Sequence, residues 1–95
     1  MAGYLVFDIE ITDPEAWDEY RAVAGPVMEA AGGRFVMASR RIEPLEGDWT
    51  PASLSVVEFP SYEAARDFYH SKAYQDLVPM RERASLGRGV LVEGV

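Results

Sequence analysis

The chain has 95 residues, which suits one domain with one hydrophobic core and excludes a cofactor domain beside a substrate domain. Nine basic residues against sixteen acidic ones give a formal net charge of −7, which disfavours nucleic acid and anionic membrane surfaces as partners. Cysteine is absent, which excludes disulfides, thiolate nucleophiles and Cys-ligated metal sites. No segment resembles a signal peptide or a membrane span, so we expect a cytoplasmic protein.

The first expected element is a strand over residues 4–11, because apolar and polar side chains alternate along it. Asp13 is then placed to cap a helix that begins at Pro14 and carries an apolar side chain every three or four residues. Because proline lacks an N–H, the Gly-Pro pair at 25–26 predicts a kink or two shorter helices, and the glycines at 32–33 end the segment.

A second strand is expected over residues 34–42, where apolar side chains occupy alternate positions. Two glycines precede this segment and a proline follows it. The loop that follows, residues 43–52, is longer than a usual hairpin connection and contains Trp49. Residues 53–59 then alternate again and predict a third strand.

Two helices and a last strand complete the chain. Ser61 is a good cap for a short helix, and a further helix is expected from Ser71 to about residue 84 with a local break at Pro79. The glycines in residues 87–89 predict a turn that leads into a strand over residues 90–93.

This βαββαβ order predicts an α+β, ferredoxin-like domain over residues 1–95, with an antiparallel sheet and its helices on one face. The other face would be bare, and its expected residues are Tyr4, Val6, Asp8, Glu10, Leu54, Val56 and Glu58. A half-apolar exposed sheet on so small a domain usually finds a partner. The simplest partner is a second copy, so we expect a homodimer.

Six segments in this order resemble the bacterial family called domain of unknown function 1330: residues 13–20 (DPEAWDEY), 25–26 (GP), 32–35 (GGRF), 45–49 (LEGDW), 57–69 (VEFPSYEAARDFY, followed by Ser71 and Tyr74) and 91–94 (LVEG). The resemblance implies a dimeric α+β barrel, in which two ferredoxin-like subunits place their bare sheet faces together. It implies no settled reaction, because that superfamily includes cofactor-independent monooxygenases, isomerases, haem-degrading enzymes and ligand-binding proteins.

The candidate catalytic residues are Asp8, Arg40, Glu58 and His70. His70 is the only histidine, and it serves either as a base or simply as a complement to the dipole at the end of its helix. Asp8 and Glu58 lie on strands expected to be adjacent, where one of two close carboxylates gains a raised pKa. Arg40 would neutralise them or bind an anionic substrate, and a set of ion pairs at the dimer interface explains the same residues.

The candidate ligand-binding residues are the aromatic side chains of Tyr20, Trp49, Tyr69 and Tyr74. Aromatic residues at helical spacing are more often core than pocket, but Trp49 lies in a loop with no helical period. It would cap a cavity or pack onto the second subunit. Arg81 and Arg83 are interpreted as solvated partners of Glu82 and nearby acids.

No spacing of His, Asp and Glu fits a metal site, no glycine-rich loop fits a nucleotide, and a chain without asparagine lacks part of the haem-degrading pattern. We therefore expect no cofactor. The function expected is small-molecule binding, either by a cofactor-independent monooxygenase-like or isomerase-like enzyme acting on a small hydrophobic substrate, or by a non-catalytic metabolite-binding or stress-related accessory protein.

Overall fold

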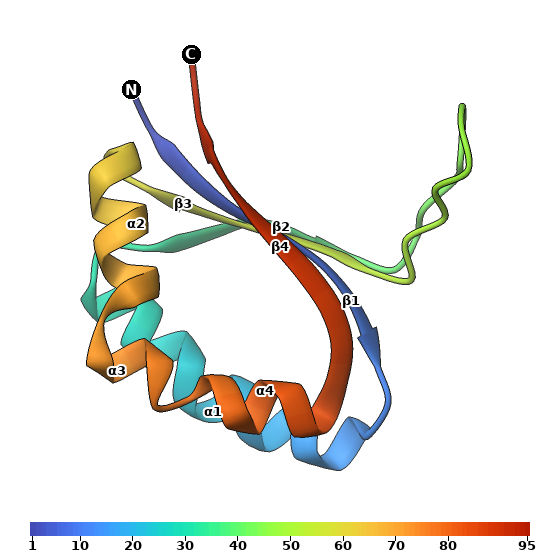
Figure 1. Cartoon of the computed structure of the whole chain (residues 1–95), viewed down its shortest axis with the longest axis horizontal. Coiled ribbons are helices and arrows are strands. Elements are labelled where there is room, and N and C mark those ends of the chain that lie inside the picture. The colour runs from blue at the N-terminus through green and yellow to red at the C-terminus, as the bar shows by residue number, and fades with distance from the viewer.

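The computed structural model describes residues 1–95 and contains one antiparallel four-stranded sheet with all of its helices on one face (Figure 1). The elements in chain order are β1 (Gly3–Ile11), α1 (Pro14–Ala30), β2 (Arg34–Ser39), β3 (Leu54–Phe59), α2 (Tyr62–His70), α3 (Lys72–Gln75), α4 (Val78–Ala84) and β4 (Ser85–Glu93). The strand order β2-β3-β1-β4 confirms the ferredoxin-like α+β fold. No helix has the length and hydropathy needed to cross a membrane.

Strand β1 divides the molecule into its two faces, because it lies between β3 and β4 and its side chains alternate. Leu5, Phe7 and Ile9 point to the helices and are at most 9% exposed. The core cluster around them comprises Tyr20, Ala24, Met28, Val57, Phe59, Ala65, Phe68 and Tyr74. The alternate residues, such as Tyr4 and Val6, lie on the face that the helices leave uncovered, which we call the open face.

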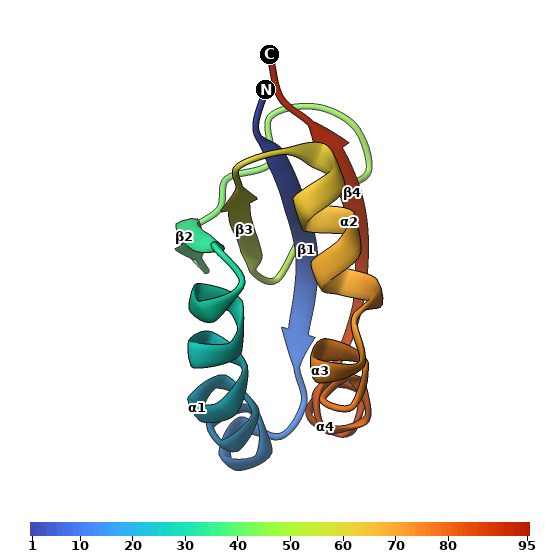
Figure 2. The same cartoon turned by 90° about the vertical axis from the view of Figure 1, so that its left-hand side faces the viewer.

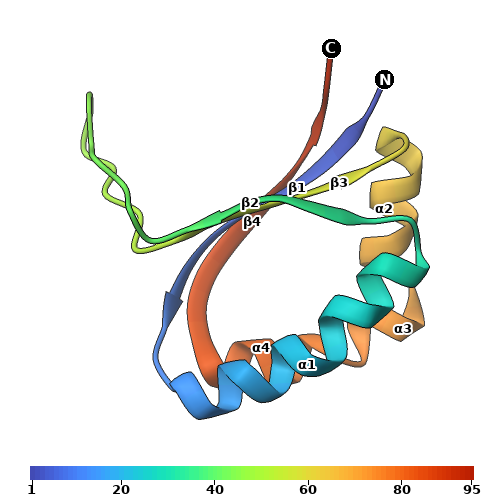
Figure 3. The ribbon, with the colours of Figure 1, turned by 180° about the vertical axis from the view of Figure 1, so that it is seen from behind.

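The helices cover the other face in two columns, with α1 beside the series α2–α4 and β1 running behind the line between them (Figure 2). Capping fixes where they start: the carboxylate of Asp13 accepts the backbone N–H of Ala16, and Ser61 and Ser71 cap α2 and α3 in the same way. The segment 40–53 between β2 and β3 projects from the opposite side of the sheet (Figures 1 and 3).

Two helix breaks differ from those predicted: α1 is not divided into two helices, and the later break lies elsewhere. Helix α1 continues through Pro26 as one element, because Tyr20, Ala24 and Met28 on either side of the proline are buried together in the core. That burial outweighs the single backbone hydrogen bond that proline removes. The second break lies before Val78 rather than at Pro79, which occupies the first turn of α4, where its missing N–H costs nothing.

Two strand predictions also need correction. Strand β2 ends at Ser39 rather than at residue 42, and its pairing with β3 is shifted between Phe35 and Met37, as in a β-bulge. Gly87 and Gly89 form no turn, because β4 begins at Ser85 and pairs with β1 through both of them. A Cβ on Gly89 would lie 2.6 Å from the Phe7 ring, so a glycine is needed there for packing.

Candidate functional site

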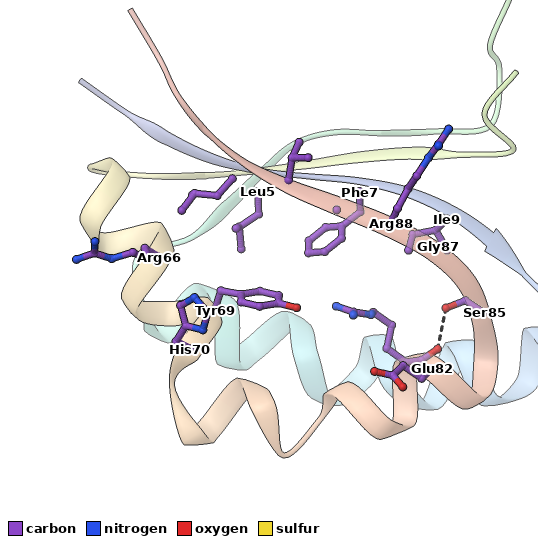
Figure 4. Close-up of a pocket in the computed structure, with 14 residues that line it drawn as sticks. Leu5, Phe7, Ile9, Arg66, Tyr69, His70, Glu82, Ser85, Gly87 and Arg88 are labelled. Atoms are coloured by element: carbon purple, nitrogen blue, oxygen red, sulfur yellow. Dashed lines mark hydrogen bonds between the residues drawn. The ribbon is translucent and has the colours of Figure 1, made fainter. Parts of the chain in front are cut away.

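A cavity of about 330 Å³, the first cavity, lies between the sheet and helices α2 and α4. The side chains of Leu5, Phe7, Ile9 and Leu91 supply its apolar surface. Figure 4 shows that the Tyr69 ring reaches into it from α2, whereas Arg66 and Arg88 point away from it. The volume lies at the small end of the range for small-molecule sites.

The chemically distinctive group of this cavity is the guanidinium of Arg81 on α4. The side chain is half-buried, and its Cζ atom lies 5.3 Å from the centre of the Phe7 ring. Its Nη1 atom donates a 2.8 Å hydrogen bond to the hydroxyl of Tyr74, which is in turn 2.8 Å from the hydroxyl of Tyr20. No carboxylate forms an ion pair with Arg81.

Two ionisable groups at this site, Tyr20 and Arg81, have shifted pKa values. Burial raises the pKa of the Tyr20 hydroxyl, and the neighbouring Tyr74 hydroxyl adds to the rise, so Tyr20 stays a neutral phenol. Burial lowers the pKa of Arg81, but the hydroxyls of Tyr74 and Tyr69 outweigh that effect and raise it above its ordinary value. The arginine therefore keeps its full positive charge beside the apolar side chains that line part of the cavity.

A second cavity of about 570 Å³ lies on the other side of Arg81, between α1 and strands β1, β2 and β3. Its apolar surface comes from Ile11, Trp17, Tyr20, Ala24, Met28, Phe35, Leu54 and Val57. Phe7, Ile9 and Arg81 border both cavities. These three side chains are thus the wall between them.

The aromatic candidates of α1 to α3 take three different positions. Tyr69 borders the first cavity and Tyr20 the second, as lining residues. Tyr74 is fully buried between them and borders neither, so it acts through its hydroxyl alone. His70 borders the first cavity from the exposed end of α2. Of the four catalytic candidates, only His70 lies at this cavity.

Asp8 and Glu58 lie on the open face, each with its own pair of partners. The carboxylate of Glu58 accepts hydrogen bonds from Arg34 at 2.8 Å and from Tyr4 at 3.0 Å. These two hydrogen bonds, of which the one from Arg34 has the larger effect, hold the pKa of Glu58 below its usual range. A base that acts at neutral pH needs a raised pKa instead. Asp8 accepts from the Trp49 indole at 2.9 Å and from Arg88 at 3.3 Å.

Arg40 and Trp49 do not reach the first cavity. Arg40 borders the second cavity and forms no ion pair with Asp8 or Glu58. Trp49 is 49% exposed and holds the loop to the open face through its bond to Asp8. The structure contains no group of three or more His, Cys, Asp or Glu side chains suited to a metal ion.

The interpretation of Arg81 as a solvated partner of Glu82 was wrong. Glu82 is exposed and unpaired, whereas Arg81 is packed against Phe7 and bonded to Tyr74. One sequence signal was available: Arg81 follows Tyr74 by seven residues, two helical turns, which places both on one face of a helix. The break between α3 and α4 hides that relation, because the two residues lie on different helices.

Comparison with known proteins gives a family and a fold. The family model of the domain of unknown function 1330 matches residues 2–95. The crystal structure of RPA0582 from Rhodopseudomonas palustris, described as a protein of unknown function, matches with a TM-score of 0.74 at 21% identity, over 99% of this chain and 82% of that chain. SnoaB from Streptomyces nogalater, described as a cofactor-independent oxygenase, matches with a TM-score of 0.70 at 13% identity, over 99% and 93%.

A third similar structure is that of HapK from Hahella chejuensis, with a TM-score of 0.68 at 14% identity, over 98% of this chain and 92% of that chain. At such identities the solved structures establish the α+β fold that they share with this chain. No curated protein sequence matches the chain.

Proposed function

The chain belongs to the domain of unknown function 1330 family, and on that basis we propose that it binds a small aromatic organic anion in the first cavity. The observation that carries the proposal is the half-buried guanidinium of Arg81, which no carboxylate of the chain neutralises. A charge removed from water is costly unless it is paired. A carboxylate, phenolate or enolate of the ligand supplies the missing pair, and Phe7 with Leu91 packs against its apolar part.

The same geometry supports cofactor-independent catalysis on an acidic C–H substrate. In this scheme the proton leaves carbon for the imidazole of His70, and the electron pair moves to the substrate oxygen beside Arg81. The enolate then either takes the proton back at another carbon, which is isomerisation, or its carbon forms a bond to dioxygen, the oxidant. In the second case the peroxide anion so formed takes the proton from His70 and leaves as a hydroperoxide. The likeness in fold to a protein described as a cofactor-independent oxygenase favours this class. A ligand that is bound but never converted would instead identify a metabolite-binding protein.

We further propose that two copies of the chain pair through their open faces. The middle row of that face, formed by Met37, Val56, Val6 and Val90, is apolar, and Met37, Val90 and the nearby Val92 are more than 40% exposed. Asp8 and Glu58 have their partners within their own subunit, so a second copy could cover them without leaving a charge unpaired. Native mass spectrometry tests this pairing, and a monomer at all concentrations would contradict it.

Binding is tested with 1-naphthoate, measured by isothermal titration calorimetry. Arg81→Gln should weaken binding about 10-fold or more, because a hydrogen bond to a charged group is worth about 1.5–3 kcal/mol. Arg83→Gln is the matched control, since Arg83 lies two residues away on the same helix but is exposed. Equal affinity in Arg81→Gln and the unmodified protein, with circular dichroism showing both folded, would refute the proposal.

A further inference from the structure

The first and second cavities share one wall, and that wall is the proposed anion-binding group. We propose that they are two halves of one ligand site, which takes a molecule with its anionic oxygen in the middle and an apolar arm on each side. This inference rests on the proposed function, because it requires Arg81 to bind the anion. It adds the substrate class: a diaryl 1,3-diketone, or a compound with the same central enolate and a large apolar arm on each side.

The wall is thin and consists of three side chains. Phe7 and Ile9 of β1 border both cavities from the sheet, and Arg81 borders both from α4. The guanidinium lies over the Phe7 ring, 5.3 Å from its centre. Nothing else in the lining is common to the two cavities. A ligand that bonds to Arg81 therefore has open space on either side of the bond.

Each half is suited to an apolar arm. The first cavity, of about 330 Å³, offers Leu5 and Leu91, and the second, of about 570 Å³, offers Trp17, Met28 and Phe35. Phe35 is 51% exposed, so a ligand arm in the second cavity would remove apolar surface from water. A ligand confined to the first cavity would leave that surface uncovered.

The position of the guanidinium is fixed by a buried chain of hydrogen bonds. Arg81 donates to Tyr74, and the Tyr74 and Tyr20 hydroxyls are 2.8 Å apart, with both rings at most 5% exposed. One N–H of the five on the guanidinium is used in this chain. The Tyr69 hydroxyl also lies near the guanidinium, and the remaining N–H groups are left for a ligand. The planar fork suits an enolate whose charge is shared by two oxygens.

The test compares two probes by titration calorimetry. 1,3-Diphenylpropane-1,3-dione carries an aryl arm on each side of its enol, and 1-phenylbutane-1,3-dione carries only one. We expect the two-armed probe to bind about 10-fold more tightly or better, from the apolar area of its second ring. Gly25→Leu should abolish that advantage, because Gly25 borders the second cavity and a Cβ there meets no other atom within 4 Å. Val23→Leu, on the exposed side of α1, is the matched control.

The outcomes separate the two proposals. Equal affinity for both probes, or an equal loss of both in Gly25→Leu with the fold intact, would overturn the two-armed site. If Arg81→Gln still weakens both probes in that case, the anion-binding function of the first cavity stands. If Arg81→Gln weakens neither probe, the function proposed for Arg81 fails, and the inference drawn from it fails too.

Discussion

Replacing Tyr74 by phenylalanine removes the middle hydroxyl of the chain that links Tyr20 to Arg81. The Tyr20 hydroxyl would then lose its protein partner, and Tyr20 is only 5% exposed. An unsatisfied buried polar group costs about 1–3 kcal/mol, whereas the half-exposed Arg81 can replace its lost bond with water. We expect Tyr74→Phe to lower the free energy of unfolding by about 2–3 kcal/mol.

Thermal unfolding followed by far-ultraviolet circular dichroism measures this effect, at a fixed protomer concentration because assembly shifts apparent stability. For a chain of 95 residues the Tm should fall by roughly 8–24 °C, since 1 kcal/mol corresponds to roughly 4–8 °C. Tyr4→Phe is the matched control, because its hydroxyl bonds to Glu58, a carboxylate that keeps its ion pair with Arg34 when this bond is lost.

A double-mutant cycle makes the reasoning refutable. In Tyr20→Phe the Tyr74 hydroxyl still accepts from Arg81, so the loss should be smaller, about 1 kcal/mol. In the double variant no buried hydroxyl is left without a partner, so its cost should fall below the sum of the single costs by about 1 kcal/mol. Additive costs, or a Tyr74→Phe cost no larger than that of Tyr4→Phe, would show that the chain contributes nothing to the fold.

Because Arg34 holds the pKa of Glu58 low, the ionised carboxylate stabilises the fold at neutral pH. This contribution is lost as the pH falls below the ordinary pKa of 4.5 and through the lowered pKa of the folded state. Glu58→Gln should therefore flatten that part of a curve of Tm against pH, and an unchanged curve would contradict the argument. Gly87→Ala should lower the free energy of unfolding in urea by about 1–3 kcal/mol, because its Cβ would lie 2.8 Å from a backbone oxygen of β1. Gly25→Ala in the middle of α1 should instead raise that free energy by about 0.5–1 kcal/mol. The opposite signs would refute the packing argument. Trp49→Ala should leave the circular dichroism spectrum and the assembly mass unchanged, since the indole is half-exposed and its single bond lies on a loop; loss of the dimer would show that the loop is part of the interface.

The fold was predictable because its signals are local. The alternation of Leu5, Phe7 and Ile9 and the capping residues Asp13 and Ser61 each depend on a few neighbours in the chain. Gly87 misled the prediction because glycine has the same local signature in a turn and in a tightly packed strand. Only the contact with β1, almost eighty residues away in the chain, distinguishes the two.

The candidate site was less predictable, since it depends on which way long side chains point. Tyr69 and His70 lie at the end of one helix, as their sequence pattern predicts, but only the seven-residue spacing from Tyr74 distinguishes the half-buried Arg81 from the exposed Arg83 in the sequence. Both arginines flank Glu82 on a short helix. Their difference arises from the packing of α4 against α1 and the Phe7 ring, a tertiary relation that periodicity over so few residues does not encode.

The pairing of β1 with β4 sets how this chain has to fold. Nine residue pairs join the two strands, from Gly3 with Glu93 to Ile11 with Ser85, and the Gly94 N–H also bonds to the Ala2 carbonyl at 2.8 Å. The entropy of closing such a long loop must be overcome before any of these pairs stabilises the sheet, which makes the central ladder a late and slow event. Because the ends lie side by side (Figure 1), a circular permutant with residues 95 and 1 joined and new ends in segment 40–53 would convert that ladder into a hairpin and speed folding.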